Sequence, residues 1–209
     1  MNIILLGPQG SGKGTQARLL CDKYGFFYFE SGAYLRKIAN KYPEIAQMMN
    51  SGNLVPDKEM TSYLTAYLDQ EHLYDDIVFD GFPRTLTQFN FLKVWLSERS
   101  VNIDLAFVLE ISEEETLRRL GGRRVDPETG KIYNIVTEPS LIDVDLQKLI
   151  QRDDDKPDAI KKRLEIYNTR TIELISEIEK QSKVIKINGE QEVEKIHNEM
   201  VQQIEEFKK

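Results

Sequence analysis

The chain has 209 residues, of which 40% are hydrophobic and 30% charged, an ordinary balance for a globular protein that argues against disorder. Its 28 basic and 35 acidic residues leave a net charge of −7, which argues against general nucleic-acid binding because phosphate backbones need a positive surface. A single cysteine, Cys21, excludes an internal disulfide and a multi-cysteine zinc site.

The composition also bears on where the protein works. No apolar run approaches the ~20 residues that a membrane-spanning helix needs. Residues 1–6 lead into Gly7 without a basic leader, so we expect no signal peptide. We therefore expect a reducing, cytoplasmic location and no membrane partner.

Strands and helices are expected to alternate, because short apolar runs bounded by Gly and Pro are separated by segments of helical periodicity. In the strand expected at 2–6, every residue after Asn2 is apolar, which suits a parallel strand buried on both faces. The expected elements are a strand at 2–6, a helix at 14–24 closed by Gly25, a strand at 26–29, short helices between 32 and 70, a strand at 77–79, a helix at 86–99, a strand at 105–109, a helix at 113–120, a long helix from 157 to about 181, a strand at 184–187 and a helix at 190–207.

Two stretches interrupt this alternation. Residues 31–60 contain Pro and Gly breakers, and residues 122–152 combine Gly and Pro with scattered Ile and Val, which predicts a small β-like lobe. The alternation predicts an α/β fold with a parallel sheet. The two interruptions are expected to be insertions above the carboxyl edge of the sheet, where ligands bind in such folds.

The segment GPQGSGK at residues 7–13 fits the pattern G-x-x-x-x-G-K between a buried strand and a helix, the context of a phosphate-binding loop. The glycines let successive N–H groups point into one concavity. The helix N-terminus adds partial positive charge and Lys13 adds a full one. Such a loop holds nucleotide phosphates. Gly14 follows the lysine where many such loops carry Ser or Thr for Mg²⁺, and Thr15 comes one residue later.

A second motif, DGFPR at residues 80–84, follows the apolar strand expected at 77–79. An acid in this position commonly holds the metal in phosphate-loop proteins, so Asp80 is the candidate Mg²⁺ ligand, through water. Arg84 comes four residues later and can clamp an anion with two parallel hydrogen bonds.

These motifs resemble those of adenylate kinases and related nucleoside-monophosphate kinases. GPQGSGKGTQ (7–16), SGAYLR (31–36), DGFPRTLTQ (80–88), GRRV (122–125) and QRDDD (151–155) recur in that order. The resemblance is to the long-lid type and covers essentially the whole chain. It implies a P-loop three-layer α/β sandwich with a five-stranded parallel sheet. The CORE would comprise residues 1–30, 61–121 and 153–209, with an NMP-binding insertion at 31–60 and a LID insertion at 122–152.

The resemblance implies an enzyme that transfers the terminal phosphoryl group of MgATP to AMP, giving two ADP. Its partners would be ATP, AMP and ADP, its cofactor Mg²⁺ and its role adenine-nucleotide homeostasis, and it would act as a monomer. The implied ATP-binding residues are Gly10, Ser11, Gly12, Lys13, Gly14, Thr15, Arg119, Arg123, Ile132, Tyr133 and Gln191.

The resemblance also implies an AMP site, in which Gln88 matches the glutamine that reads the adenine edge. Phosphoryl transfer brings two polyanions together, and several arginines must neutralise them. The implied AMP-binding residues are Ser31, Gly32, Arg36, Asn53, Leu54, Val55, Gly81, Phe82, Pro83, Arg84, Gln88, Arg152 and Arg163, and the implied catalytic residues are Lys13, Arg84, Arg123, Arg152 and Arg163.

The chain departs from the family pattern near the metal site and in the LID segment. Ala33 stands where the family has a carboxylate that helps to organise the water around the metal, so we expect the Mg²⁺ site to depend more on Asp80. The LID segment lacks a cysteine quartet, which excludes structural zinc in that form. In its place we expect a hydrogen-bonded cluster of Asp126, Thr129, Asp143 and Asp145.

Two other functions stay open at this point. A kinase for UMP or CMP would use similar motifs, although Gln88 and a full LID favour AMP. A weakly active nucleotide-binding regulator is the interpretation that Ala33 favours. Six arginines at motif junctions argue against it: Arg36, Arg84, Arg119, Arg123, Arg152 and Arg163.

Overall fold

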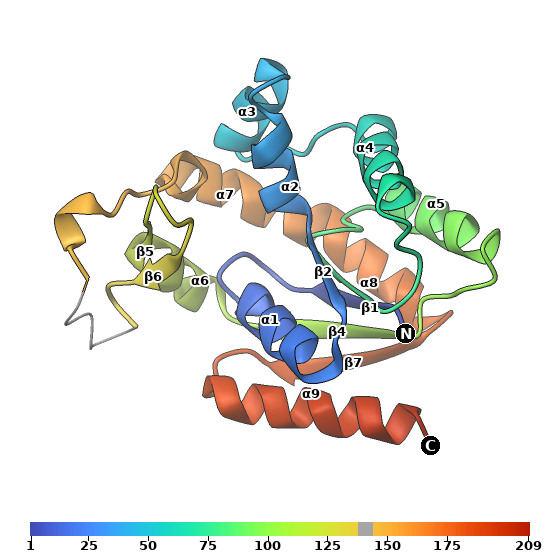
Figure 1. Cartoon of the computed structure of the whole chain (residues 1–209). Helices are drawn as coiled ribbons and strands as arrows, with labels where there is room; N and C mark the ends of the chain where they lie inside the picture. The colour runs from blue at the N-terminus through green and yellow to red at the C-terminus, as the bar shows by residue number, and fades with distance from the viewer. Residues whose placement is uncertain (138–143) are drawn as a thin grey trace.

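The computed structural model describes residues 1–137 and 144–209, and its centre is a five-stranded parallel sheet (Figure 1). The strand order is β2-β3-β1-β4-β7. The chain therefore passes to one side of β1 and then to the other, which makes the carboxyl end of β1 a topological switch point. The strands of this sheet are β1 (Ile3–Leu6), β2 (Phe27–Glu30), β3 (Ile77–Asp80), β4 (Leu105–Glu110) and β7 (Lys183–Asn188).

Helices cover both faces of the sheet, and two segments extend beyond it: α2–α3 and the antiparallel pair of β5 (Arg123–Val125) and β6 (Ile132–Asn134) (Figure 1). None of the helices in the described part of the chain combines the length and apolarity needed to span a bilayer. The helices are α1 (Lys13–Tyr24), α2 (Ser31–Ile38), α3 (Pro43–Asn50), α4 (Asp57–Gln70), α5 (Leu86–Ser97), α6 (Glu113–Gly122), α7 (Pro157–Ile166), α8 (Ile172–Glu179) and α9 (Val193–Phe207), with short 3₁₀ turns η1 (Leu146–Lys148) and η2 (Asp153–Asp155) and a π segment η3 (Tyr167–Thr171).

Alternate side chains of each strand enter two separate apolar layers. Along β1, Ile3 and Leu5 pack with residues of α1 and α9, whereas Ile4 and Leu6 pack with residues of α4, α5 and α8. Both layers are closed to solvent, so every position of the strand must be apolar. This explains the uninterrupted apolar run at the start of the chain, and it confirms the predicted three-layer α/β fold with five parallel strands.

The long helix expected from 157 to about 181 is interrupted. It is built from α7, the π segment η3 and α8. A π turn holds one more residue than an α turn and often occurs at functional sites. Here Thr171 Oγ1 donates to the Arg84 carbonyl oxygen (3.3 Å), and Thr169 Oγ1 donates back to the Glu165 carbonyl oxygen (2.8 Å). The apolar periodicity did not reveal this widening, because it changes the helical phase only locally.

A substitution at Phe107 tests the apolar layer that includes residues of α1 and α9, because the Phe107 side chain is fully buried in this layer. We expect Phe107→Ala to lower the free energy of unfolding by about 3–5 kcal/mol, since the lost burial and the cavity add together. The matched control is Val94→Ala on α5, whose residue is 58% exposed. It should change the stability by no more than about 0.5 kcal/mol. Urea unfolding followed by circular dichroism measures both, and equal midpoints for the two variants would contradict this packing.

Candidate active site

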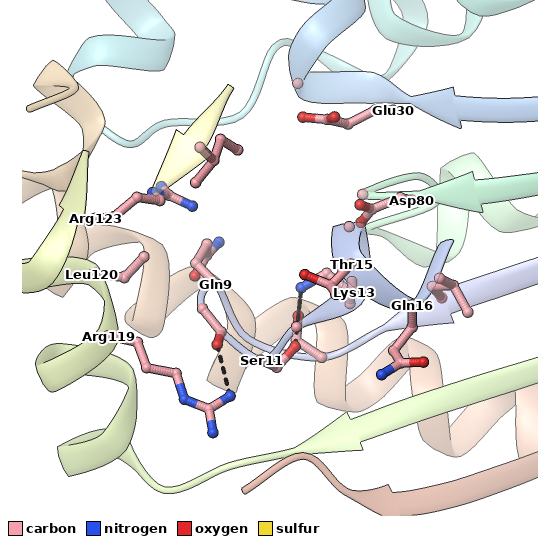
Figure 2. A pocket seen from close by; sticks show the side chains of 18 of the residues that line it. Gln9, Ser11, Lys13, Thr15, Gln16, Glu30, Asp80, Arg119, Leu120 and Arg123 are labelled. Carbon is pink, nitrogen blue, oxygen red and sulfur yellow. Dashed lines mark hydrogen bonds between the residues drawn. The ribbon is translucent and has the colours of Figure 1, made fainter. Parts of the chain in front are cut away.

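The carboxyl ends of the central strands open into a cavity of about 910 Å³. The phosphate-binding loop, the ends of β2 and β3, the β5–β6 hairpin and α7 all contribute to its walls. All six arginines that the sequence singled out line it. Figure 2 shows Glu30 and Asp80 on one side of the cavity and Arg119 and Arg123 on the other.

The phosphate-binding loop follows β1 directly and depends on glycine at its two ends. Gly7 has φ 139°, and a Cβ there would lie 2.4 Å from the Leu109 carbonyl oxygen. Gly12 has φ 94° at the N-terminus of α1, a conformation that other residues rarely adopt. The loop therefore presents backbone N–H groups and a helix N-terminus to the cavity, an arrangement that attracts anions.

Lys13 brings a full charge into this loop. Its Nζ donates to the carbonyl oxygens of Gly7 (2.8 Å) and Pro8 (2.7 Å). Burial lowers the pKa of Lys13 to about 8, and the nearby Arg84 acts in the same direction, while Asp80 opposes the shift. Phosphate oxygens would relieve this desolvation, so the loop favours a polyanionic ligand.

Asp80 ends β3, next to Leu5 of β1 in the sheet register, and is 7% exposed. Burial raises the pKa of Asp80, and Lys13 counteracts the rise. Its Oδ2 accepts a hydrogen bond from Tyr28 Oη (2.9 Å). Figure 2 places the carboxylate beside Lys13 and Thr15. Carboxylate oxygen next to a phosphate-binding loop is the donor chemistry that Mg²⁺ prefers, so the residues present fit this ion.

Glu30 is a second carboxylate in this region that the sequence analysis missed. It ends β2 and pairs with Asp80 in the sheet register. Its carboxylate accepts from Tyr28 Oη (3.3 Å) and Arg36 Nη2 (3.0 Å). Ala33, which stands where the family has a carboxylate, is exposed on α2. The signal for Glu30 was its place at the end of a strand, which only the sheet register connects with Asp80.

Two aspartates of η2 hold three of the arginines. Asp154 binds Arg152 through two hydrogen bonds (2.8 and 2.6 Å) and also accepts from Arg163 Nη1 (2.8 Å). Asp155, whose side chain is fully buried, binds Arg123 through both of its carboxylate oxygens. The run DDD was visible in the sequence, but no role was predicted for it. These carboxylates offset the repulsion among arginines gathered at one cavity.

Burial and ion pairing act in opposite directions on Asp154. Burial alone would raise its pKa, but Arg163 and Arg152 outweigh burial and lower the pKa to about 2. The pKa of Arg163 is also shifted. Burial lowers it to about 9, although the nearby Asp154 carboxylate acts to raise it. The carboxylate is therefore ionised at neutral pH and fixes two guanidinium groups.

A smaller hollow of about 50 Å³ adjoins the large cavity. Leu35, Met49, Val55 and Met60 form its apolar wall, and Gln88 supplies a polar edge. The predicted residues Asn53 and Leu54 line it as well, together with Arg84 and Arg163, which also line the large cavity. An apolar wall with amide groups at its edge suits a nucleobase.

The comparison with protein families agrees with this geometry. The family model described as adenylate kinase matches residues 5–183. The chain belongs to the adenylate kinase family. Its relatives include the adenylate kinases of Petrotoga mobilis (36% identical, 100% of both chains), Fervidobacterium nodosum (35%, 94% of both) and Pyrococcus furiosus (36%, 94% of this chain and 92% of the relative). The resemblance drawn from the motifs is confirmed.

One residue that the resemblance to adenylate kinases suggested for AMP binding lies elsewhere. Phe82 lines neither cavity, and its side chain is fully buried in the apolar layer of α4, α5 and α8. Its neighbours Gly81 and Pro83 do line the large cavity. An aromatic ring that follows β3 is drawn into the core by burial of its area. Ser31 is also positioned here, because its Oγ donates to the Gly81 carbonyl oxygen (2.8 Å).

The residues implied for the ATP side line the large cavity. Gly10, Ser11, Gly12, Gly14 and Thr15 of the loop line it. So do Arg119, Ile132, Tyr133 and Gln191, although they come from three separate parts of the chain. Arg119 Nη1 donates to the Gly10 carbonyl oxygen (3.2 Å), which joins α6 to the loop (Figure 2).

The acidic cluster expected in the LID segment is found only in part. Asp126 Oδ2 accepts from Thr129 Oγ1 (2.7 Å), as expected. Asp145 instead accepts from the Gln147 backbone N–H (3.1 Å) and begins η1. Asp143 lies outside the described residues. Within residues 1–137 and 144–209, no group of three or more His, Cys, Asp or Glu could hold a metal ion.

Asp154 links the stability of the protein to pH. Its side chain is 11% exposed, and its pKa falls from 3.8 to about 2. A carboxylate with a lowered pKa stabilises the fold fully above its unfolded value of about 4 and loses that contribution as pH falls towards 2. The shift corresponds to roughly 2–3 kcal/mol. We therefore expect Asp154→Asn to unfold more easily than the native chain by at least that amount at pH 7, with a smaller difference at pH 3.

The matched control for this prediction is Asp153→Asn, whose side chain is 53% exposed and pairs with Lys156 at the surface. A surface ion pair contributes about 0–1 kcal/mol, so this variant should stay close to the native chain. Urea unfolding at pH 7, 4 and 3 measures all three proteins. A difference between Asp154→Asn and the native chain that does not change with pH would contradict the ionisation argument.

Proposed function

We propose that this protein transfers the terminal phosphoryl group of ATP reversibly to the phosphate of AMP, giving two ADP. The observation that carries this conclusion is one cavity that joins a phosphate-binding loop to six arginines. Membership of the adenylate kinase family supports it. A phosphate-binding loop alone would suit any nucleotide, whereas arginines from several elements around it suit two polyanions at once.

On the donor side, the loop N–H groups and Lys13 hold the ATP phosphates, and Arg119 and Arg123 add charge from the adjoining wall. The base and ribose lie towards Ile132, Tyr133 and Gln191. These residues share the cavity with the loop, which supports this assignment. The hydrogen bond from Arg119 to the Gly10 carbonyl oxygen (3.2 Å) positions this arginine against the loop before the nucleotide arrives.

On the acceptor side, Arg36 and Arg84 hold the AMP phosphate, and the base enters the smaller hollow at Gln88. Arg84 is fixed by the hydrogen bond from its Nε to the Gly81 carbonyl oxygen (2.6 Å). Arg152 and Arg163 approach from η2 and α7 and contact the phosphates of both nucleotides. This arrangement holds the AMP phosphate oxygen in line with the γ-phosphorus of ATP.

The reaction needs no nucleophile from the protein. An oxygen of the AMP phosphate bonds to the γ-phosphorus, the bond to the β,γ-bridging oxygen breaks, and ADP leaves with that electron pair. The arginines and Lys13 stabilise the negative charge that spreads over the transferring group. Exclusion of water prevents hydrolysis, and this is the role of the NMP-binding insertion (31–60) and the LID insertion (122–152).

Residue 60, the end of the proposed NMP-binding insertion, lies inside α4 (Asp57–Gln70), whose Leu64 and Leu68 belong to the core. The proposed boundary at residue 60 therefore divides α4, and residues 61–70 of this helix fall in the CORE range 61–121.

Mg²⁺ accompanies ATP, and Asp80 would hold it through water, with Glu30 as a second carboxylate nearby. When bound, the ion neutralises charge on the phosphates. We place the enzyme in the cytoplasm as a monomer that maintains the balance of adenine nucleotides in nucleotide biosynthesis.

The experiment that tests this function is a coupled assay with MgATP and each of AMP, GMP, UMP and CMP. We expect turnover with AMP and at least a tenfold lower kcat/KM with the other acceptors, because the hollow at Gln88 suits adenine. Higher kcat/KM with UMP or CMP would overturn the acceptor assignment. Nucleotide binding without turnover would overturn the proposed activity itself.

Arg84 tests the role of the arginines in catalysis. We expect Arg84→Met to lower kcat by about 10³-fold or more, because the methionine keeps most of the volume but removes the charge that stabilises the transferring phosphoryl group. Arg170→Met is the control, since Arg170 is exposed on η3. Steady-state kinetics with AMP and MgATP measure both variants. Similar kcat values for them would contradict a catalytic role for Arg84.

A further inference from the structure

Asp57 contacts Gln88, which lines the smaller hollow, and none of the sequence motifs includes Asp57. It is the first residue of α4, and its carboxylate reaches the start of α5. Asp57 Oδ1 accepts a hydrogen bond from Gln88 Nε2 (2.8 Å), and its Oδ2 accepts one from Thr85 Oγ1 (3.0 Å). Residues 31 positions apart in the chain are thereby joined at the amide that faces the hollow.

The other end of the Gln88 amide is fixed as well. Gln88 Oε1 accepts a hydrogen bond from the Arg84 backbone N–H (2.7 Å). The Gln88 backbone N–H donates to Thr85 Oγ1 (3.2 Å), which holds the first turn of α5. A rotation of the amide by 180° would place its NH₂ against the Arg84 N–H and its oxygen against the Asp57 carboxylate. Both new contacts would be repulsive, so the amide has one stable orientation.

These contacts leave Gln88 with a defined pattern for a ligand. A primary amide has two N–H donors and two acceptor lone pairs. Asp57 uses one donor and the Arg84 N–H uses one lone pair, so one donor and one lone pair remain. Adenine presents an N6–H donor beside the N1 acceptor, which complements this pair. Hypoxanthine presents the O6 acceptor beside an N1–H donor, which would require the rotated amide.

We propose that Asp57 is a positioning residue that sets the base selectivity of the acceptor site by fixing the orientation of the Gln88 amide. This inference rests on the proposed function, in which the acceptor base lies in the hollow lined by Gln88. Gln88 is 2% exposed, so a mismatched partner cannot be replaced easily by water. An unpaired polar group in such a place weakens binding by roughly tenfold to a hundredfold.

The test compares AMP with inosine 5′-monophosphate (IMP), whose base differs from adenine only at the edge in question. Dissociation constants from isothermal titration calorimetry and kcat and KM with MgATP are measured for the native chain, Asp57→Ala and Asp57→Asn. Glu59→Ala is the matched control. Glu59 is exposed, and its substitution removes the other acid from the first turn of α4. It separates loss of helix stability from loss of the contact to Gln88.

In Asp57→Ala we expect KM for AMP to rise several-fold with a smaller change in kcat, and the preference for AMP over IMP to fall about tenfold. The amide introduced by Asp57→Asn can present either its oxygen or its NH₂ to Gln88, so this variant should show a preference between those of the native chain and Asp57→Ala. Glu59→Ala should match the native chain. If Asp57→Ala does not melt cooperatively, Asp57→Ser replaces it, since its shorter side chain still supports the helix N-terminus.

The outcomes separate this inference from the proposed function. A native chain that binds AMP but does not transfer phosphate removes the proposed activity, while the binding ratios still test Asp57. A folded Asp57→Ala that keeps the native AMP-to-IMP ratio overturns the role of Asp57 and leaves the proposed function standing. An equal loss of preference in Glu59→Ala also overturns it, because the effect would then come from the stability of α4.

Discussion

The active site gathers positive charge around one cavity, and the rest of the structure has to make this arrangement stable. Six arginines and Lys13 line the same space, and like charges in a partly dry site repel strongly. The carboxylates of Asp154 and Asp155, both buried residues of η2, offset this repulsion, since they bind Arg123, Arg152 and Arg163. The pKa of Asp154 is lowered because its attraction to the arginines is stronger than the effect of burial, which would raise it. The guanidinium groups are thereby held near the cavity before any phosphate enters.

The parallel sheet decides where this charge meets the nucleotides. Because the carboxyl ends of parallel strands share one edge, the loop after β1, Glu30 at the end of β2 and Asp80 at the end of β3 come together. The apolar layers on the two faces of the sheet hold the strands that form this edge. The π segment between α7 and α8 then turns Tyr167 and Thr171 towards the same cavity, where Thr171 contacts the backbone at Arg84.

The proposed selectivity for the base resembles the charge cluster, in that a side chain assigned to the ligand is held by a residue behind it. Gln88 faces the hollow, while Asp57 and the backbone of Arg84 fix its amide. In both places a carboxylate accepts hydrogen bonds from a long polar side chain and helps to fix its position. Such preorganisation reduces the entropy lost on binding and strengthens discrimination between similar ligands.

The sequence by itself determined which segments form the strands of the parallel sheet and where the phosphate-binding loop lies. It also showed that Asp80 follows an apolar strand and that six arginines stand at the junctions of the motifs. These signals are local, since each depends on periodicity or on a few adjacent residues. Only the tertiary structure decided that Glu30 lies beside Asp80, that Asp154 and Asp155 hold the arginines, that Asp57 reaches Gln88 and that Phe82 turns into the core. It also decided the break in the long helix. Most of these features are pairings between residues far apart in the chain, and they arise from how the sheet and helices pack, which no local pattern records.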